Sequence, residues 1–215
     1  MAQLIEDIDA SVVRDNLARV REEIAGTGRD PGDVELLAAV KYVAVEHIGA
    51  LVEAGIDVMG ENRAQDLEVK AAAQPGVTWD FIGHLQSRKV KQVLPHVRYI
   101  HSVASDSVLA QLERHGTPET EVLVEVNIAG EEDKSGIAPA ELDHFLERCP
   151  VTVVGLMTMP PLAEKPEDSR RWFAALAELA GERGLRHLSM GTSQDYVVAV
   201  QEGATIVRLG TTLYR

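Results

Sequence analysis

The sequence is poor in cysteine, in basic charge and in long apolar runs, and each shortage excludes a class of protein. Cys149 is the single cysteine of 215 residues, so the chain lacks a disulfide partner and the cysteine pairs of zinc sites. The 34 acidic side chains outnumber the 21 basic ones, and the net charge of −13 argues against duplex nucleic acid and anionic membranes as partners. No apolar run approaches a membrane span, and residues 1–7 lack the apolar core of a signal peptide. We therefore expect a cytoplasmic protein.

The sequence does contain a regular alternation of short apolar runs and amphipathic segments. Apolar residues recur at helical spacing from Ile5 to Ile24 and predict an N-terminal helix. Eight candidate strands follow, at residues 34–40, 56–59, 78–82, 99–102, 122–127, 151–156, 187–190 and 205–209. Seven candidate helices lie between them, at residues 45–54, 62–73, 87–94, 106–115, 138–147, 167–182 and 193–201.

This alternation predicts an α/β protein with a single (β/α)8 TIM barrel that spans residues 1–215 as one domain and carries an extra N-terminal helix. A doubly wound open sheet is the competing fold. It needs fewer strands and usually has a glycine-rich phosphate loop after the first strand, where this chain has Lys41-Tyr-Val-Ala. The barrel is favoured.

Polar residues gather at the carboxyl ends of the predicted strands, which is where barrels carry their function. Lys41 ends the first apolar run, and a partly desolvated amine at this place can form a Schiff base. A solvated or ion-paired lysine is the plainer interpretation of Lys41. Asn62 is predicted as a helix N-cap or a ligand contact, and His84 as a ligand donor or a structural histidine. Histidine, cysteine and acidic residues show no metal-ligand spacing, so no metal is expected.

The segments after the seventh and eighth strands predict an anion site, because these two loops are the recurrent phosphate site of the fold. Ser193 is a natural N-cap for a helix that begins near Gln194, and Gly210 lets a ligand approach the backbone. Arg208 lies two residues before Gly210 and needs a partner if it faces the barrel interior. Glu61, Asp195 or a ligand could be that partner. A Schiff-base lysine with a phosphate site suits either pyridoxal 5′-phosphate (PLP) or a sugar-phosphate aldolase substrate.

Seven ordered motifs make the chain similar to the pyridoxal phosphate homeostasis proteins of the YggS/PROSC type, which are related to the N-terminal domain of alanine racemase. The motifs are LLAAVK around Lys41, GEN at 60–62, FIGHLQSRKVK at 81–91, VEVNIAGEEDKSG at 124–136, GLMTMPP at 155–161, LSMGTSQDY at 188–196 and VRLGTTLY at 207–214. The resemblance runs from about Val12 to the C-terminus. It implies a single barrel that binds PLP.

The resemblance also implies a role for each residue of the site. Lys41 would hold PLP covalently as the internal aldimine, and Arg208 would face the pyridine nitrogen. The phosphate would be held by Ser193 and by the backbone around Gly210 and Thr211. The ring pocket would be lined by three further residues, Asn62, Met157 and His84. Val40 and Thr192 depart from the residues usual in the family, which are serine or threonine and methionine.

Two features argue against efficient racemase activity in a protein of this family: Arg208 and the end of the chain. A permanently charged arginine cannot accept the ring's proton, so the cofactor would be a weak electron sink. Racemase relatives add a tyrosine from a second domain, and this chain ends at Arg215. We expect a monomeric protein that buffers or carries PLP, with apo-enzymes as recipients. A weak PLP-dependent racemase and a cofactor-free aldolase are the alternatives. Tyr42 is expected on the opposite side from Lys41, and Lys134 is expected to be solvated.

Overall fold

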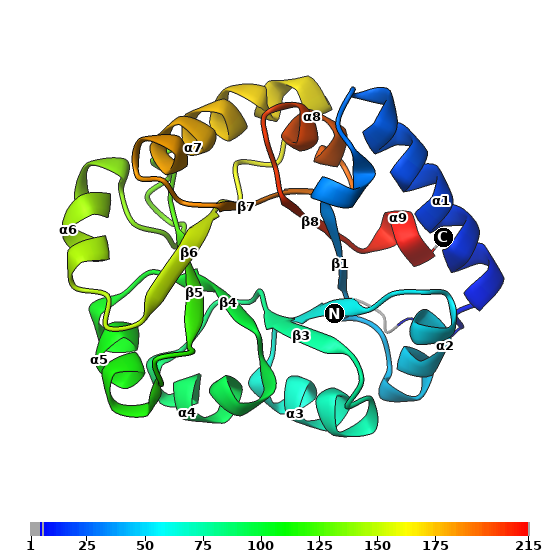
Figure 1. The fold of residues 1–215 in the computed structure, drawn as a ribbon, viewed down its shortest axis with the longest axis horizontal. Helices are drawn as coiled ribbons and strands as arrows, with labels where there is room; N and C mark the ends of the chain where they lie inside the picture. Colours follow the sequence, from blue (N-terminus) through cyan, green and yellow to red (C-terminus); the bar gives the residue numbers. More distant parts are fainter. Residues whose placement is uncertain (1–4, 6, 215) are drawn as a thin grey trace.

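A computed structural model describes residue 5 and residues 7–214 and contains a closed barrel of eight parallel strands (Figure 1). In chain order the strands are β1 Glu35–Ala39, β2 Val58–Glu61, β3 Thr78–Phe81, β4 Tyr99–Val103, β5 Glu121–Glu125, β6 Thr152–Met157, β7 His187–Thr192 and β8 Ile206–Leu209. Each strand pairs with its neighbour, and β1 closes the barrel by pairing with β8 from Glu35↔Ile206 to Ala38↔Leu209. The predicted barrel is confirmed. The signal-peptide prediction rests mostly on residues outside the described part of the chain.

Helices surround the barrel on its outer side (Figure 1). They are α1 Ala10–Gly26, α2 Ile48–Glu53, α3 Ala64–Ala73, α4 Val90–Val93, α5 Asp106–His115, α6 Leu142–Glu147, α7 Arg170–Glu182, α8 Tyr196–Gln201 and α9 Thr211–Tyr214. Several predicted helices begin with a 3₁₀ turn, so the α-helical part starts later than expected; these turns are Val45–His47, Ser87–Lys89, Pro139–Glu141 and Pro166–Ser169. No helix of the described residues is long and apolar enough to cross a membrane.

Helix α1 is the predicted N-terminal helix, although it begins five residues later than the apolar spacing suggested. The Asp9 carboxylate accepts the Ser11 amide and caps the helix at this point. Ile5 belongs instead to an isolated bridge with Val43, which places it beside the loop after β1. The buried face of α1, including Leu17 and Val20, packs into the main core between helices and barrel.

The barrel interior holds a second, smaller apolar cluster and a set of buried polar residues. The cluster comprises Leu37, Val58, Tyr99, Leu123, Met157 and Ile206. At the amino-terminal end, Arg98 donates to both carboxylate oxygens of Glu35 at 2.7 and 2.6 Å and to Asp80 at 3.1 and 2.6 Å. The amino ends of a barrel contribute to stability more than to function, and this ionic cluster is consistent with that role.

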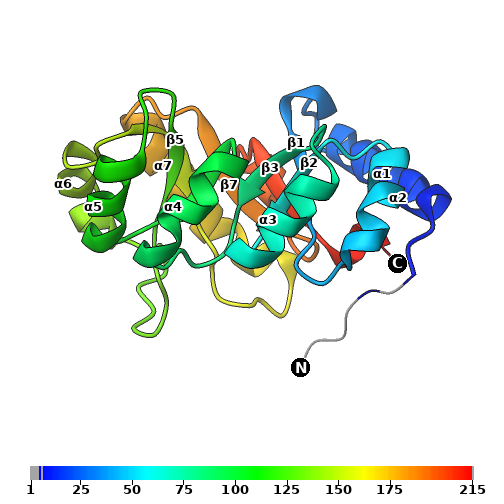
Figure 2. The ribbon, with the colours of Figure 1, turned by 90° about the horizontal axis from the view of Figure 1, so that it is seen from below.

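Asp80 is fully buried and remains ionised because of its partners. Burial alone would raise the pKa of Asp80, but the hydrogen bonds and charges of His101 and Arg98 outweigh burial and lower it. The cluster thus ties β1, β3 and the start of β4 together beneath the barrel. Figure 2 shows that the loops after β5 and β6 project together from one side of the barrel.

Candidate functional site

A cavity of about 520 Å³ opens at the carboxyl ends of the strands, a volume typical of small-molecule sites. Its walls come from loops that follow strands in every part of the barrel. The structure brings all of the predicted site residues to this one cavity: Lys41, Asn62, His84, Met157, Ser193, Arg208, Gly210 and Thr211. The cavity is rich in cationic groups although the whole chain has a net charge of −13.

Lys41 lies in the turn that follows β1, and its side chain is exposed. The partial desolvation that we expected for this amine is therefore wrong. Its Nζ atom lies 5.1 Å from the centroid of the Tyr42 ring. Both residues line the cavity, so the prediction that Tyr42 faces away is also wrong. The strand has ended at Ala39, and the alternation of strand side chains does not extend into the turn.

The backbone just before Lys41 is fixed by two buried side chains. Lys70 donates from Nζ to the Val40 carbonyl at 2.7 Å and pairs with the Glu61 carboxylate at 2.5 Å. The Tyr214 hydroxyl donates to the Ala39 carbonyl at 3.1 Å. Lys70 and Glu61 are both buried, so Glu61 serves as an ion-pair partner and lies outside the set of residues that line the cavity. The last two residues before the lysine are thereby held while the lysine itself is exposed.

Ser193 joins the loops after β7 and β8. Its Oγ atom accepts the amide of Gly210 at 3.1 Å and the amide of Thr212 at 3.3 Å. The predicted capping role is wrong, because α8 begins at Tyr196 and Asp195 occupies the N-cap position. The Asp195 carboxylate accepts the Thr192 amide at 2.8 Å and holds the first of these loops in place. The two loops therefore form one connected wall of the cavity.

Arg208 enters the cavity floor from inside the barrel and is 6% exposed. Its Nη1 donates to the Ser189 carbonyl at 2.7 Å and the Ser189 hydroxyl at 2.5 Å. Its Nη2 donates to the Thr158 carbonyl and the Met159 sulfur, each at 2.9 Å. The predicted carboxylate partners, Glu61 and Asp195, are wrong, because within residues 7–214 all four acceptors are neutral.

The charge and the last donor of Arg208 remain available to a ligand. Burial lowers the pKa of Arg208 to about 10, against the opposing effects of Glu125 and Asp195, so the guanidinium is protonated at neutral pH. Its Nε–H group donates to none of the described residues. This donor lies at the cavity and can therefore serve an acceptor on a bound molecule.

Asn62 and His84 lie at the cavity without strong ties to the protein. The Oδ1 atom of Asn62 is buried and has no hydrogen-bond partner among the described residues. Arg63 occupies the N-cap position of α3, so the capping role predicted for Asn62 is wrong. His84 is exposed and forms no hydrogen bond within the described part of the chain, which disfavours a structural histidine. Both side chains can therefore contact a ligand.

Several cavity residues escaped the sequence analysis. Lys134 is exposed, as expected, but it also lines the cavity and pairs with the Glu131 carboxylate at 2.5 Å. Glu125 ends β5 and accepts the Ser135 hydroxyl at 2.7 Å. Tyr214 lies in the last helix. Because a closed barrel pairs β8 with β1, the predicted fold could have indicated that this helix lies near β1.

The fold and the cavity define a barrel of the alanine racemase N-terminal-domain class, and the family described as "Alanine racemase, N-terminal domain" matches residues 8–215. The pyridoxal phosphate homeostasis protein of Aquifex aeolicus is 39% identical over 213 residues, which cover 92% of this chain and 93% of that protein. The chain belongs to the pyridoxal phosphate homeostasis protein family.

Two solved structures are similar over nearly the whole chain. The crystal structure of an unknown protein from Bifidobacterium adolescentis has a TM-score of 0.87 at 33% identity, and the match covers 99% of this chain and 98% of that one. The structure of PipY from Synechococcus elongatus with PLP bound has a TM-score of 0.79 at 31% identity, with 94% and 100% of the two chains covered.

The buried pair beneath Lys41 yields a stability prediction. Lys70→Met leaves the Glu61 carboxylate buried without its cation, and we expect the free energy of unfolding to fall by about 3–5 kcal/mol. Urea denaturation followed by circular dichroism measures the loss. Arg148→Met is the matched control, because the Arg148–Asp106 pair is exposed and we expect it to contribute at most about 1 kcal/mol. Equal losses in the two variants would contradict the structural role of Lys70.

Proposed function

We propose that the chain binds PLP, holds it covalently through Lys41, and buffers or carries it in vitamin B6 homeostasis without efficient turnover. The observation that carries this proposal is the composition of one cavity. It combines an exposed primary amine at Lys41, a wall built from the loops after β7 and β8, and a buried guanidinium at Arg208. The amine suits an aldehyde, the wall suits an anionic group, and the guanidinium suits a ring nitrogen that accepts a hydrogen bond.

The residues present fit the cofactor on three counts. The Ser193 oxygen accepts two backbone amides, so its hydroxyl proton can be donated to a phosphate, and Gly210, Thr211 and Thr192 line the same polar wall. The unpartnered Oδ1 of Asn62 offers an acceptor, and Met157 offers an apolar surface for the ring. The relatives support the same ligand, since PipY was solved with PLP bound and the curated relatives are named pyridoxal phosphate homeostasis proteins. They disfavour a cofactor-free aldolase.

Arg208 is the reason to propose holding over turnover. Bound PLP supplies an aldehyde and an electron-withdrawing ring, whose strength depends on protonation of the ring nitrogen. Arg208 keeps its own proton at neutral pH, since the pKa of about 10 lies well above that value. It would therefore donate a hydrogen bond to the ring nitrogen of bound PLP and would leave that nitrogen without a proton. The ring then withdraws electrons weakly, which favours retention over reaction.

We further propose that the protein acts as a monomer in the cytoplasm and that PLP-dependent apo-enzymes receive the cofactor. The single cysteine supports the location. The exposure of Lys41 supports release, because a recipient or a small amine can approach a group that the protein does not cover.

The lysine is tested by its removal. We expect the purified protein with added PLP to show a visible absorbance band, and borohydride to abolish the band and leave a stable adduct on the Lys41 peptide in mass spectrometry. Lys41→Ala is expected to lose both signals while its melting temperature stays close to that of the wild type. Lys134→Ala, a second cavity lysine, is the matched control and is expected to keep both. A wild-type protein that gains no band would overturn the proposal.

The proposed phosphate site at the loops after β7 and β8 is tested by placing a larger side chain at Gly210. A Cβ atom at Gly210 would meet only the Ala39 carbonyl, at 3.8 Å, so Gly210→Val is expected to fold normally. The added methyl groups occupy space beside the cavity, and we expect PLP affinity to fall by about tenfold or more, as overpacking of this size implies. Equilibrium titration of the visible band measures the affinity. Gly76→Val, at a position with no atoms within 4 Å and outside the cavity, controls for the substitution itself.

Carrier and enzyme are separated by proton exchange at the α-carbon of amino acids. We expect the loaded protein to exchange deuterium into alanine no faster than an equal concentration of free PLP does, because the ring nitrogen is unprotonated. Nuclear magnetic resonance follows the exchange directly. Fast exchange that disappears in Lys41→Ala would show a PLP-dependent enzyme of the racemase type and would end the carrier hypothesis.

A further inference from the structure

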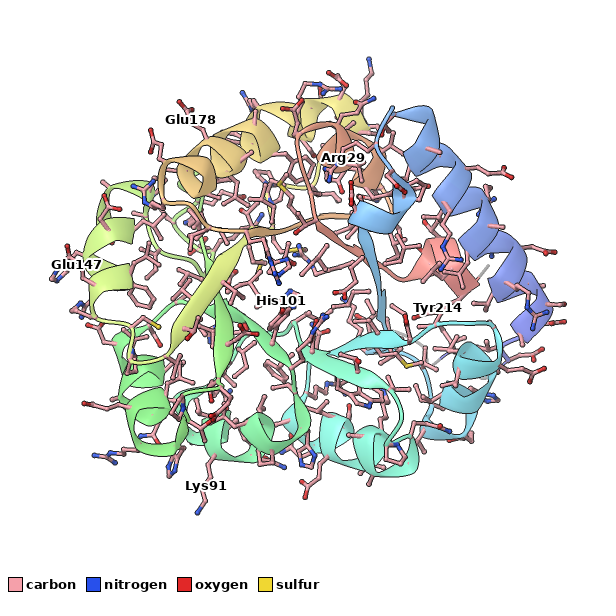
Figure 3. The ribbon with its side chains drawn as sticks, in the orientation of Figure 1. Arg29, Lys91, His101, Glu147, Glu178 and Tyr214 are labelled. Carbon is pink, nitrogen blue, oxygen red and sulfur yellow. The ribbon has the colours of Figure 1, made fainter. Side chains whose placement is uncertain are left out.

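A continuous chain of hydrogen bonds runs through the barrel interior from Arg208 to the ionic cluster at the amino-terminal end. The Ser189 hydroxyl lies 2.5 Å from Arg208 Nη1 and 2.8 Å from His101 Nδ1. His101 Nε2 lies 3.1 Å from the Asp80 carboxylate, which Arg98 contacts from the other side. Figure 3 shows His101 inside the ring of strands, and its side chain is fully buried. The PLP-binding proposal assigns no role to this histidine.

Counting donors and acceptors fixes the direction of every bond in this chain. A guanidinium only donates, so the Ser189 hydroxyl accepts from Arg208 and must place its own proton elsewhere. The direction of the remaining bonds follows from Asp80, because its ionised carboxylate only accepts and His101 Nε2 must therefore carry a proton. In a neutral imidazole Nδ1 then has no proton, so it accepts from the Ser189 hydroxyl. Asp80 thus sets the tautomer of His101, and His101 sets the orientation of the Ser189 hydroxyl.

The surrounding charges support a neutral His101. Burial lowers the pKa of His101, and the positive charges of Arg208 and Arg98 lower it further against the effect of Asp80. The Asp80 charge is already shared with Arg98, so it does not require a second cation. A neutral imidazole at this place matches the bond directions that the donor count requires.

The hydrogen-bond partners of Arg208 are uncharged, and this affects how the guanidinium can interact with a ligand. A carboxylate bonded to Arg208 would hold the guanidinium but would also cancel its charge. Ser189 holds it with a carbonyl and a hydroxyl, and the first carboxylate of the chain, Asp80, is two hydrogen bonds farther away. The guanidinium is therefore fixed in position, while its charge and its Nε–H group remain available to a ligand in the cavity.

We propose that Ser189 and His101 are positioning residues, which orient the Arg208 guanidinium toward the ring nitrogen of the ligand through a hydrogen-bond relay anchored at Asp80. The ligand part of this inference rests on the proposed binding of PLP. The relay itself exists in the protein alone, so it can be tested with and without the cofactor.

The test without ligand uses nitrogen-15 nuclear magnetic resonance of the full chain. We expect His101 to be a neutral imidazole with its proton on Nε2 at neutral pH. Ser189→Ala and His101→Leu are expected to speed hydrogen exchange at the Arg208 side chain, identified by its loss in Arg208→Lys, by about tenfold, as loss of one hydrogen bond to a charged group implies. His101→Gln is expected to keep hydrogen exchange at Arg208 as slow as in the wild type, because the glutamine amide can accept from Ser189 and donate to Asp80. An imidazolium, an Nδ1–H tautomer or unchanged exchange would overturn the relay.

The test with ligand uses the rate at which the loaded protein releases PLP, followed by the visible band. We expect Ser189→Ala and His101→Leu to release PLP about tenfold faster and His101→Gln to stay near the wild type. Val108→Ala removes a buried side chain in α5 and controls for general destabilisation. If His101→Leu fails to fold, the rate at which Ser189→Ala releases PLP decides between the two outcomes. Faster Arg208 exchange with unchanged release would overturn positioning toward the cofactor. A wild-type protein that binds no PLP would overturn the proposed function, and the exchange rates would still judge the relay.

Discussion

The pairing of β1 with β8 is the constraint on which the rest of the site depends. An open parallel sheet has two unpaired edge strands, but here β1 and β8 pair, with Leu37 beside Arg208 and Ala38 beside Leu209. Closure therefore brings the turn that carries Lys41 next to the loop that begins at Gly210. The same closure places Tyr214, the last described residue, against the Ala39 carbonyl. Residues from the two ends of the chain share one cavity because the barrel is closed.

The buried charge of Arg208 is the second determinant of the site. Moving a guanidinium into the barrel costs free energy, and the structure offsets this cost with four neutral acceptors. Among the described residues no carboxylate is hydrogen-bonded to the guanidinium, so its charge makes the cavity floor positive in a chain whose net charge is −13. An acidic protein can thus hold an anionic molecule at one place and repel anions elsewhere on its surface.

The barrel, and the gathering of the predicted residues around one cavity, could be predicted because both depend on local patterns. Strand periodicity located every strand to within a few residues, and residues after parallel strands must share one rim. The partner of Arg208 could not be predicted, because it depends on which side chains of distant strands meet inside the barrel. Ser189, His101 and Asp80 come from three strands, and no spacing in the sequence links them. Tyr42 was misplaced because a strand pattern was extended into a turn.

The structure combines a rigid support with an exposed reactive group, and this combination distinguishes holding from catalysis. Lys70 and Tyr214 fix the two carbonyls before Lys41, and the relay behind Arg208 fixes the floor of the cavity. Lys41 itself is exposed, and nothing in the described part of the chain covers it from the solvent side. An enzyme gains rate by excluding water and by placing acid–base groups on both faces of its cofactor. A carrier needs firm but reversible attachment and access for a recipient, and an open rim above a fixed floor provides both.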